Sequence, residues 1–207
     1  MSAHFDLELL PISAQETHMN RTSASHPIRI AELEVGIQGG AIGITFAPGK
    51  FQEVAMTGSW ARDIDMDLAA IRAWGADHLI TLIEPWEFEE LRIQSLPERA
   101  AAHGLIWHSL PITDGAAPDA RLLDQWETLG PLLSRELIAG RKIVVHCKGG
   151  LGRAGTVATM LLLDTGAALD GEEAIRMARQ VRPGAIETSA QEDFIRRWII
   201  SKQCRRT

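Results

Sequence analysis

The chain has 207 residues, a hydrophobic content of 45% and a formal net charge of -6 at pH 7. This length and hydrophobic content are sufficient for one sizeable core. The negative net charge argues against general binding to nucleic acids or to membrane surfaces. Any site for an anion must therefore be built locally from a few residues.

The N-terminal stretch MSAHFDLELLPIS lacks the basic region of a secretion signal, and no apolar run reaches the roughly 18 residues of a membrane span. Two cysteines, Cys147 and Cys204, are too few for a disulfide framework. These features predict a cytoplasmic protein. Residues 1–27 are polar and lack clear periodicity, which predicts a loosely ordered segment before a single domain over residues 28–207.

Apolar runs of strand length alternate with helical patterns along residues 28–207. We expect strands at 28–35, 77–83, 105–110 and 142–146, and helices at 63–74, 84–93, 96–104, 119–140, 153–163, 170–183 and 188–203. Such alternation is typical of an α/β fold, with a central, mostly parallel sheet flanked by helices.

The most informative stretch is residues 141–156, RKIVVHCKGGLGRAGT. A buried strand ends at His146, a loop rich in glycine follows, and a helix begins near Arg153. Successive N–H groups of such a loop can converge on one tetrahedral anion, and the helix adds the positive end of its dipole. Arg153 can bind two oxygens of a phosphate at once. The pattern therefore predicts a phosphate cradle.

Cys147 stands at the bottom of this predicted cradle. The donors that bind an anion also stabilise a thiolate, which is the nucleophilic form of cysteine. The spacing thus places a nucleophile and an oxyanion clamp on one loop. The same stretch contains GLGRAG (150–155), which matches the G-x-G-x-x-G pattern of dinucleotide-binding proteins. A dinucleotide-binding fold needs further strand–helix units after this pattern, and only about 50 residues remain.

The C-x5-R pattern resembles the phosphate-binding loop of the cysteine-based protein tyrosine phosphatase superfamily. The stretches GAIGITFAPGKF, LPITDGAAPD, HCKGGLGRAG and RPGAIETSAQEDFI follow one another in the chain. In that order they are most similar to the kinase-associated phosphatase (cyclin-dependent kinase inhibitor 3) family of dual-specificity phosphatases. The similarity covers roughly residues 36–200 and predicts a phosphatase-like α/β fold.

The resemblance implies a covalent mechanism without a metal or cofactor. Cys147 would attack phosphorus, Arg153 would hold the phosphoryl oxygens, and Asp114 would protonate the leaving oxygen and later accept a proton from water. The remaining residues that the resemblance places at the substrate are His146, Lys148, Gly149, Gly150, Leu151, Gly152 and Gln191. His146 would orient the cysteine, and Gln191 would help to place water, although Glu187 and Glu192 lie close to it in the sequence.

Two acidic residues compete for the role of proton donor. Asp114 lies in the turn-rich stretch PITDG, whereas Asp119 stands where a helix begins and is expected to cap it. The resemblance favours Asp114.

One residue departs from the family pattern. The family usually has Ser or Thr directly after the arginine, and here the residue is Ala154. That hydroxyl helps the thiolate to leave in the second step, and Thr156 would point elsewhere on a helix. We therefore expect either slower hydrolysis of the phosphocysteine or compensation by another group.

The predicted reaction is hydrolysis of phosphorylated Tyr, Ser or Thr in proteins. Relatives in the superfamily also accept phosphoinositides and RNA ends, which the net charge of -6 disfavours. Two other readings stay open: a phosphate-binding module that no longer turns over, and a sulfur-transfer enzyme of the rhodanese type. The sequence does not give the oligomeric state, the physiological substrate or the role of Cys204.

Overall fold

The computed structural model describes residues 20–55 and 58–205. Residues 1–19 of the segment predicted to be loosely ordered lie outside the described residues. Within residues 20–27, the Arg21 N–H donates to the Ser59 carbonyl at 2.9 Å, and Ser23 is buried. The boundary predicted between residues 27 and 28 stays a prediction.

The centre of the molecule is a five-stranded sheet. Its strands lie in the order β1 (Ala31–Val35), β2 (Gly40–Phe46), β7 (Lys142–Cys147), β5 (Ala76–Thr81) and β6 (Ile106–Ser109). β1 is antiparallel to β2, and the other neighbouring strands are parallel. β3 (Phe51–Gln52) and β4 (Trp60–Ala61) form a separate antiparallel pair. The predicted mostly parallel sheet is confirmed.

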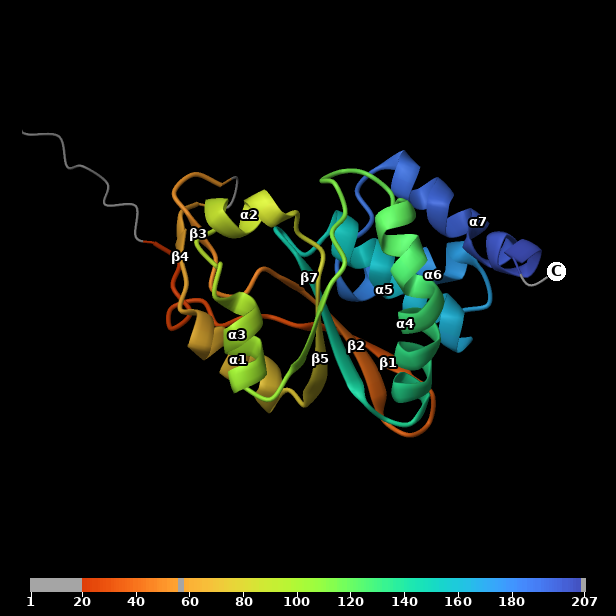
Figure 1. Ribbon diagram of the computed structural model, residues 1–207, viewed down its shortest axis with the longest axis horizontal. Helices are drawn as coiled ribbons and strands as arrows, with labels where there is room; N and C mark the ends of the chain where they lie inside the picture. The colour runs from red at the N-terminus through yellow and green to blue at the C-terminus, as the bar shows by residue number, and fades with distance from the viewer. Residues whose placement is uncertain (1–19, 56–57, 206–207) are drawn as a thin grey trace, which may run out of the picture.

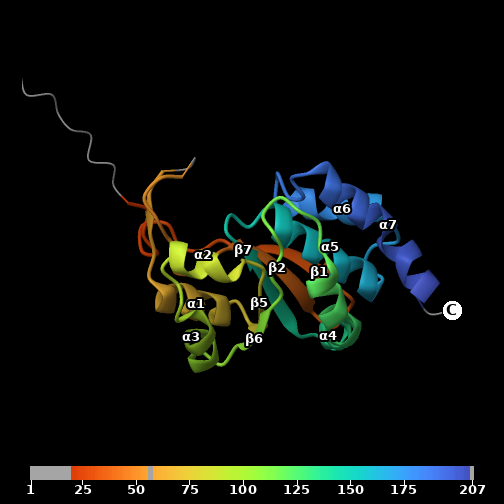
Figure 2. The same cartoon turned by 45° about the horizontal axis from the view of Figure 1, so that its top comes forward.

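Helices cover both faces of this sheet (Figures 1 and 2). One side carries α1 (Ile64–Ala73), α2 (Pro85–Glu90) and α3 (Leu96–Ala102). The other carries α4 (Ala120–Ile138), α5 (Gly152–Thr165), α6 (Gly171–Val181) and α7 (Ser189–Arg205). The α/β class predicted from the sequence is therefore confirmed.

Strand β7 separates two hydrophobic cores. Ile143 and Val145 belong to the larger cluster, which also includes side chains of α4, α5, α6 and α7. Val144 points the other way, into a smaller cluster with side chains of α1 and α3. Since successive side chains of a strand point to opposite faces, an apolar run is what a strand buried on both faces requires.

The chain turns from β7 directly into α5. Every residue of α5 from Gly152 to Leu163 is buried, and the helix packs against α4, α6 and α7. The short loop between Cys147 and Gly152 therefore lies at the carboxyl edge of the parallel strands. Ligands of open α/β sheets bind at this edge.

Candidate active site

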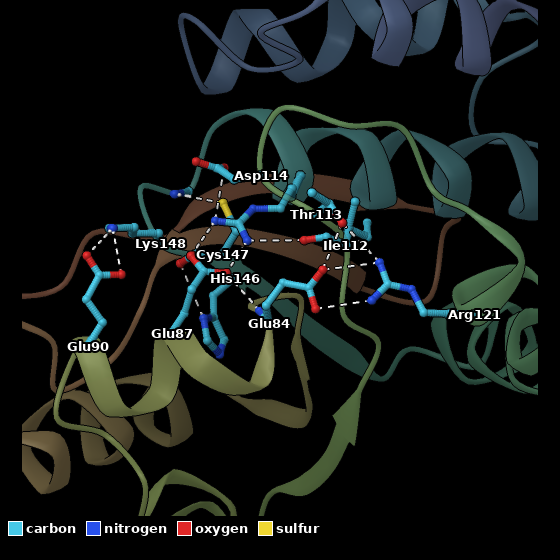
Figure 3. Close-up of polar contacts among 12 residues, drawn as sticks. Glu84, Glu87, Glu90, Ile112, Thr113, Asp114, Arg121, His146, Cys147 and Lys148 are labelled. Carbon is cyan, nitrogen blue, oxygen red and sulfur yellow. Dashed lines mark hydrogen bonds and ion pairs between the residues drawn. The ribbon is translucent and has the colours of Figure 1, made fainter.

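The loop that joins β7 to α5 has the geometry of a cradle. Cys147 ends the strand with only 3% of its surface exposed. The Gly150 N–H donates to the Cys147 Sγ at 3.2 Å, so at least one backbone amide of the loop points at the sulfur (Figure 3). A backbone donor and the positive end of α5 both favour a negative charge at this place.

Glycine is required at residue 150 of the loop, and Gly152 is closely approached by side-chain ends. Gly150 has a φ of +70°, and a Cβ there would lie 2.4 Å from the carbonyl carbon of Thr45 in β2. A Cβ on Gly152 would meet the Glu187 Oε2 at 2.5 Å. The loop is thus pressed between β2 and the segment before α7, and larger residues would displace it.

Arg182, at the end of α6, braces the loop from outside. Its Nε donates to the Gly150 carbonyl at 2.9 Å, and its Nη2 donates to the Gly149 carbonyl at 3.1 Å. Lys50 adds a longer bond of 3.4 Å from its Nζ to the Lys148 carbonyl. Three loop carbonyls are thereby turned towards cations. Sequence reasoning missed both Arg182 and Lys50.

Arg153 interacts electrostatically with Cys147 and is held by several partners, among them the labelled Glu87, Ile112 and Asp114 (Figure 3). Its Nη1 and Nη2 donate to the two carboxylate oxygens of Glu87 at 2.5 and 2.9 Å. The Nη1 also donates to the Ile112 carbonyl at 3.2 Å, and the Nη2 lies 3.1 Å from the Asp114 Oδ1. Burial works to lower the pKa of Arg153, but the hydrogen bond to Glu87 and the nearby negative groups raise it above its ordinary value.

One donor of this guanidinium has no partner. The Arg153 Nε is buried and makes no hydrogen bond within the described part of the chain. Buried donors of proteins are nearly always paired. An unpaired guanidinium N–H next to Cys147 is a group that can bind an oxygen of an anion in the cradle.

Glu87, which positions Arg153, was also missed by sequence reasoning. It lies in α2 within the acidic stretch EPWEFEE and is 1% exposed. Its Oε2 accepts the N–H of Glu84 at 2.8 Å, as part of a capping box at the start of the helix. The capping spacing was a visible signal, but it did not indicate that this carboxylate reaches an arginine 66 residues further along the chain.

Asp114 lies at the rim of the site, with 70% of its side chain exposed. Its Oδ1 is 3.1 Å from the Arg153 Nη2, so the structure brings these two predicted site residues together. Asp119 caps α4, accepts the Arg121 N–H at 3.0 Å and forms an ion pair with the Arg121 side chain. The geometry therefore favours Asp114 as the acid beside the cradle, and its role stays a prediction.

His146 is fully buried beneath the loop. Its Nε2 shares a hydrogen bond of 2.7 Å with the Thr81 hydroxyl, and its Nδ1 lies 3.4 Å from the Cys147 carbonyl. Burial lowers the pKa of His146 to about 4, with a further contribution from the positive charge of Arg153. At neutral pH this imidazole is uncharged, and its role in orienting Cys147 stays a prediction.

Gln191 is buried and lies between the loop and the acid segment. Its Oε1 accepts the N–H groups of Glu187 and Thr188 at 2.9 and 3.3 Å, and its Nε2 donates to the Ala116 carbonyl at 3.1 Å. A Cβ on Gly152 would lie 3.0 Å from both of its amide atoms, which places Gln191 against the cradle. Its role in placing water stays a prediction.

The neighbouring glutamates behave differently. Glu187 Oε2 accepts the Gly152 N–H at 2.7 Å, so this carboxylate occupies an amide at the start of α5. Glu192 instead pairs with Arg179 and Arg196 on the surface. Glu187 is thus the acidic neighbour of Gln191 that belongs to the site.

Two further loop residues can be placed. The Lys148 Nζ donates to both carboxylate oxygens of Glu90, at 2.7 and 3.0 Å (Figure 3). Ala154 is fully buried, and the Thr156 hydroxyl donates to the Gly152 carbonyl at 2.8 Å. The hydroxyl of Thr156 is therefore engaged within α5 and does not replace one at residue 154.

Residues 20–55 and 58–205 contain no group of three or more His, Cys, Asp and Glu residues that could hold a metal ion. Over the same ranges, no helix is both long and apolar enough to span a bilayer.

Comparison with known proteins connects this geometry to a family. Residues 54–195 match the family model described as "Swiss Army Knife protein, DSP-PTPase phosphatase domain". The chain is 31% identical to cyclin-dependent kinase inhibitor 3 of Rattus norvegicus over 156 residues, which is 74% of this chain and 69% of the relative. It is also 35% identical over 91 residues to protein tyrosine phosphatase type IVA 2 of Mus musculus, covering 44% of this chain and 51% of the relative.

Solved structures agree with these sequence relationships. A crystal structure of kinase-associated phosphatase, with serine in place of the catalytic cysteine, matches with a TM-score of 0.73 and 26% identity. The match covers 84% of this chain and 96% of that one. A putative protein tyrosine phosphatase from Leishmania major matches with a TM-score of 0.60 at 23% identity, over 81% and 96% of the two chains, and shows the same fold.

Proposed function

The chain belongs to the dual-specificity phosphatase (DSP-PTPase) domain family, and from this membership we propose that it hydrolyses phosphorylated Tyr, Ser and Thr residues of proteins through a phosphocysteine. The observation that carries the proposal is the meeting of three groups at one loop. The Cys147 Sγ accepts a backbone N–H, the neighbouring Arg153 keeps a buried Nε–H unpaired, and Asp114 stands 3.1 Å from that guanidinium.

In the first step, the thiolate of Cys147 attacks phosphorus and forms the phosphorus–sulfur bond. The Arg153 Nε–H and the loop amides bind the equatorial oxygens, where negative charge gathers in the transition state. Asp114 gives its proton to the leaving oxygen of the side chain. A general acid of this kind contributes roughly 10²–10⁴-fold to the rate.

In the second step, Asp114 accepts a proton from water, which attacks phosphorus and releases the thiolate and inorganic phosphate. We propose that Gln191 helps to place this water, a role that its contact with Gly152 supports. No hydroxyl follows Arg153, because residue 154 is alanine. The thiolate then leaves without the help of such a hydroxyl, although the Gly150 amide still donates to it, so we expect this step to limit turnover.

The mechanism needs no metal, since the cations that stabilise the phosphoryl group are side chains of the protein. Phosphoproteins are the proposed substrates because cyclin-dependent kinase inhibitor 3, also described as kinase-associated phosphatase, is a relative at 31% identity. The single domain over residues 28–207 and the cytoplasmic location remain part of this proposal.

The second candidate is a phosphate-binding module that turns over slowly or not at all. Ala154 is the observation that favours it, together with the engagement of the Thr156 hydroxyl inside α5. The placement of Asp114 next to Arg153 favours the enzyme, because a binding module has no use for a proton donor at its rim.

Hydrolysis of para-nitrophenyl phosphate between pH 5 and 8, in EDTA and reductant, separates the two candidates. We expect metal-independent turnover that is abolished in Cys147→Ser and lowered by about 10²-fold or more in Asp114→Asn. Asp119→Asn is the matched control and should retain activity. An inactive wild-type protein that still binds vanadate would identify the binding module instead.

A further inference from the structure

Lys50 is a buried lysine beside the catalytic loop, and no carboxylate of the described residues neutralises it. Only 5% of the residue is exposed. Within residues 20–55 and 58–205, its ammonium forms no ion pair with an Asp or Glu side chain. Buried lysines of proteins almost always have such a partner. An uncompensated charge of this kind is typical of a functional site.

The turn between β2 and β3 that carries Lys50 is fastened by a buried ion pair. The Gly49 N–H and the Arg62 Nε both donate to the Asp67 Oδ2, at 2.9 and 2.7 Å. The Arg62 N–H also donates to the Lys50 carbonyl at 3.2 Å. The backbone of Lys50 is therefore held in one place, while the carboxylate that holds the turn is paired with Arg62.

Two aromatic rings hold the ammonium of Lys50. Its Nζ lies 4.7 Å from the ring centre of Trp60 and 5.1 Å from that of Phe46. The electron-rich faces of such rings stabilise a cation. Phe46 of β2 pairs in register with Cys147 of β7. The rings thus keep the charge at the end of the sheet that carries the nucleophile.

The ammonium is coupled to the loop by a contact and by charge. The Lys50 Nζ donates to the Lys148 carbonyl at 3.4 Å. Burial lowers the pKa of Lys50 to about 8, as do the charges of Arg62, Lys148 and Arg182, whereas the negative charge of Cys147 raises it. Coupling between two sites is reciprocal. A thiolate that favours the charged lysine is therefore itself favoured by that charge.

Other cations near the loop have different partners. The Lys148 ammonium donates to both carboxylate oxygens of Glu90, at 2.7 and 3.0 Å (Figure 3). Arg182 donates to two carbonyls of the loop, at 2.9 and 3.1 Å. Arg62 is neutralised by its carboxylate. Unlike Arg62 and Lys148, Lys50 keeps a charge that no acidic side chain of the described residues compensates.

We propose that Lys50 is a positioning residue of the active site, whose ammonium holds the Lys148 carbonyl and stabilises the thiolate of Cys147. This role rests on the proposed phosphatase function and adds a residue to its first step. A thiolate that is stabilised before the substrate binds raises the fraction of nucleophilic cysteine at and below neutral pH. Lys50 acts through the loop and does not touch the substrate.

The same role makes catalysis sensitive to alkaline pH. With a pKa of about 8, Lys50 is mostly charged at pH 7 and mostly neutral at pH 9. Arginine side chains stay charged over this range. The charged and titratable groups that face Lys50, or line the same cavity, are Arg21, His26, Arg29, Arg62, Cys147, Lys148 and Arg182. Replacing the lysine by arginine therefore isolates its own titration from theirs.

Alkylation of Cys147 by iodoacetamide tests this role without any turnover. The reagent is uncharged, so a change of charge at residue 50 does not alter its approach to the sulfur. A Cys204→Ser background leaves Cys147 as the one cysteine of the chain. Lys50→Met keeps an apolar stem against the two rings and removes the charge, whereas Lys50→Arg keeps the charge.

In Lys50→Met we expect alkylation at pH 6 to slow by at least about threefold, because less of the cysteine is thiolate. At pH 9.5 the rate should stay within about twofold of wild type, because the wild-type lysine is itself largely uncharged there. Lys50→Arg should react at close to the wild-type rate at pH 6.

Lys142→Met is the matched control. Lys142 also lies over an aromatic ring, 4.5 Å from the centre of the Trp74 ring, but it pairs with Glu32 at 3.5 Å. It begins β7, whereas Cys147 ends that strand. Alkylation of Cys147 should be unchanged in this variant at both pH values. Thermal unfolding verifies that each variant is folded.

An unchanged rate at pH 6 in Lys50→Met would overturn the proposed role. Equal slowing at pH 6 and pH 9.5 would overturn it as well, because a change in access to the sulfur has that signature. Slow alkylation of folded Lys50→Arg at pH 6 would show that the charge is not the cause.

Turnover gives a second readout. For para-nitrophenyl phosphate, the ratio of kcat/KM in Lys50→Arg to that of wild type should rise several-fold between pH 7 and pH 9, as the wild-type lysine loses its proton. A ratio that stays constant would contradict the role. Failure of the proposed phosphatase function is separate: wild-type protein would then hydrolyse no phosphomonoester, and alkylation would still report on Lys50 and Cys147.

Discussion

Glu87 and Arg153 form a buried ion pair in which both carboxylate oxygens accept from the guanidinium, at 2.5 and 2.9 Å. Each side chain is 1% exposed. The pair uses the two terminal nitrogens of Arg153 and leaves the Nε for another acceptor. Glu87 thus fixes the direction in which the arginine faces Cys147.

Removing the carboxylate should damage both stability and activity. In Glu87→Ala, Arg153 would be left as a buried charge without its main partner, which costs about 3–5 kcal/mol. Denaturant unfolding should show this loss. Glu87→Gln keeps the shape but not the charge, and we expect it to remain folded with a much lower kcat. Glu89→Gln, on the same helix, is the control. Unchanged kcat in Glu87→Gln would refute a positioning role.

Restoring a hydroxyl after the arginine should speed the second chemical step. Ala154 is buried next to Arg153, and the Thr156 hydroxyl is bonded to the Gly152 carbonyl. Wild-type protein should therefore show a burst of product followed by slow turnover. Ala154→Ser supplies a donor to the leaving thiolate, worth about tenfold in the steady-state rate. An unchanged burst and turnover in Ala154→Ser would count against this assignment.

The loop should tolerate a methyl group at one glycine and not at the next. A Cβ at residue 150 would approach the Thr45 carbonyl carbon to 2.4 Å, at a φ of +70°, whereas a Cβ at Gly149 meets nothing within 4 Å. We expect Gly150→Ala to lose phosphatase activity and several degrees of thermal stability. Gly149→Ala should stay near wild type in stability. Equal effects would show that the loop is less constrained than the contacts indicate.

Histidines with a lowered pKa should make the protein sensitive to acid. The pKa of His108 is lowered to about 4 by burial and by the charge of His78, whose Nδ1 lies 3.0 Å from the His108 Nε2. The unfolded chain binds a proton near pH 6.5, so below that pH it takes up more protons than the folded state. The free energy of unfolding should fall as the pH drops from about 6.5 to 4.

A substitution of His108 isolates its contribution to the pH dependence of stability. His108→Gln removes one titrating group outside the active site, so its stability should decline less steeply over the same pH range than that of wild type. The fall should be smaller than the roughly 3 kcal/mol of a fully buried histidine with the same shift, because His108 is only half-buried and solvent screens its charge. His146, with a pKa of about 4, would leave a residual slope in the variant. Identical slopes would mean that His108 titrates normally.

Much of the fold was accessible from local patterns. The run KIVVH and the glycine-rich loop after it predicted strand β7, the cradle and the start of α5, because strand burial and loop composition are local properties. Alternation of strands and helices predicted the layers. Strand β2, in the glycine-containing stretch GAIGITF, was not predicted. The pair β3–β4 was not predicted either, since strands of two residues carry no periodicity.

The residues that surround the chemistry were harder to find. Each of these residues is far in sequence from its partner at the site. Glu87 is 66 residues from Arg153, Lys50 is 98 residues from Lys148, and Arg182 is 32 residues from Gly150. Their partners depend on how α2, the turn after β2 and the end of α6 pack against β7. In the sequence these are three charged residues in short helices and turns, where charged side chains are common. Nothing in the neighbouring residues indicates which charged side chains point towards the catalytic loop.

The acid segment is fastened to the start of the last helix. The Gly115 carbonyl accepts from the Thr188 hydroxyl at 3.0 Å, and the Ala116 carbonyl accepts from the Gln191 amide. The position of the proposed proton donor therefore depends on how α7 docks on α5. A change that shifts α7, such as a partner bound to its exposed face or a truncation of its C-terminal end, would therefore move the acid segment. Such a change would alter proton transfer by Asp114 and leave the loop that carries Cys147 in place.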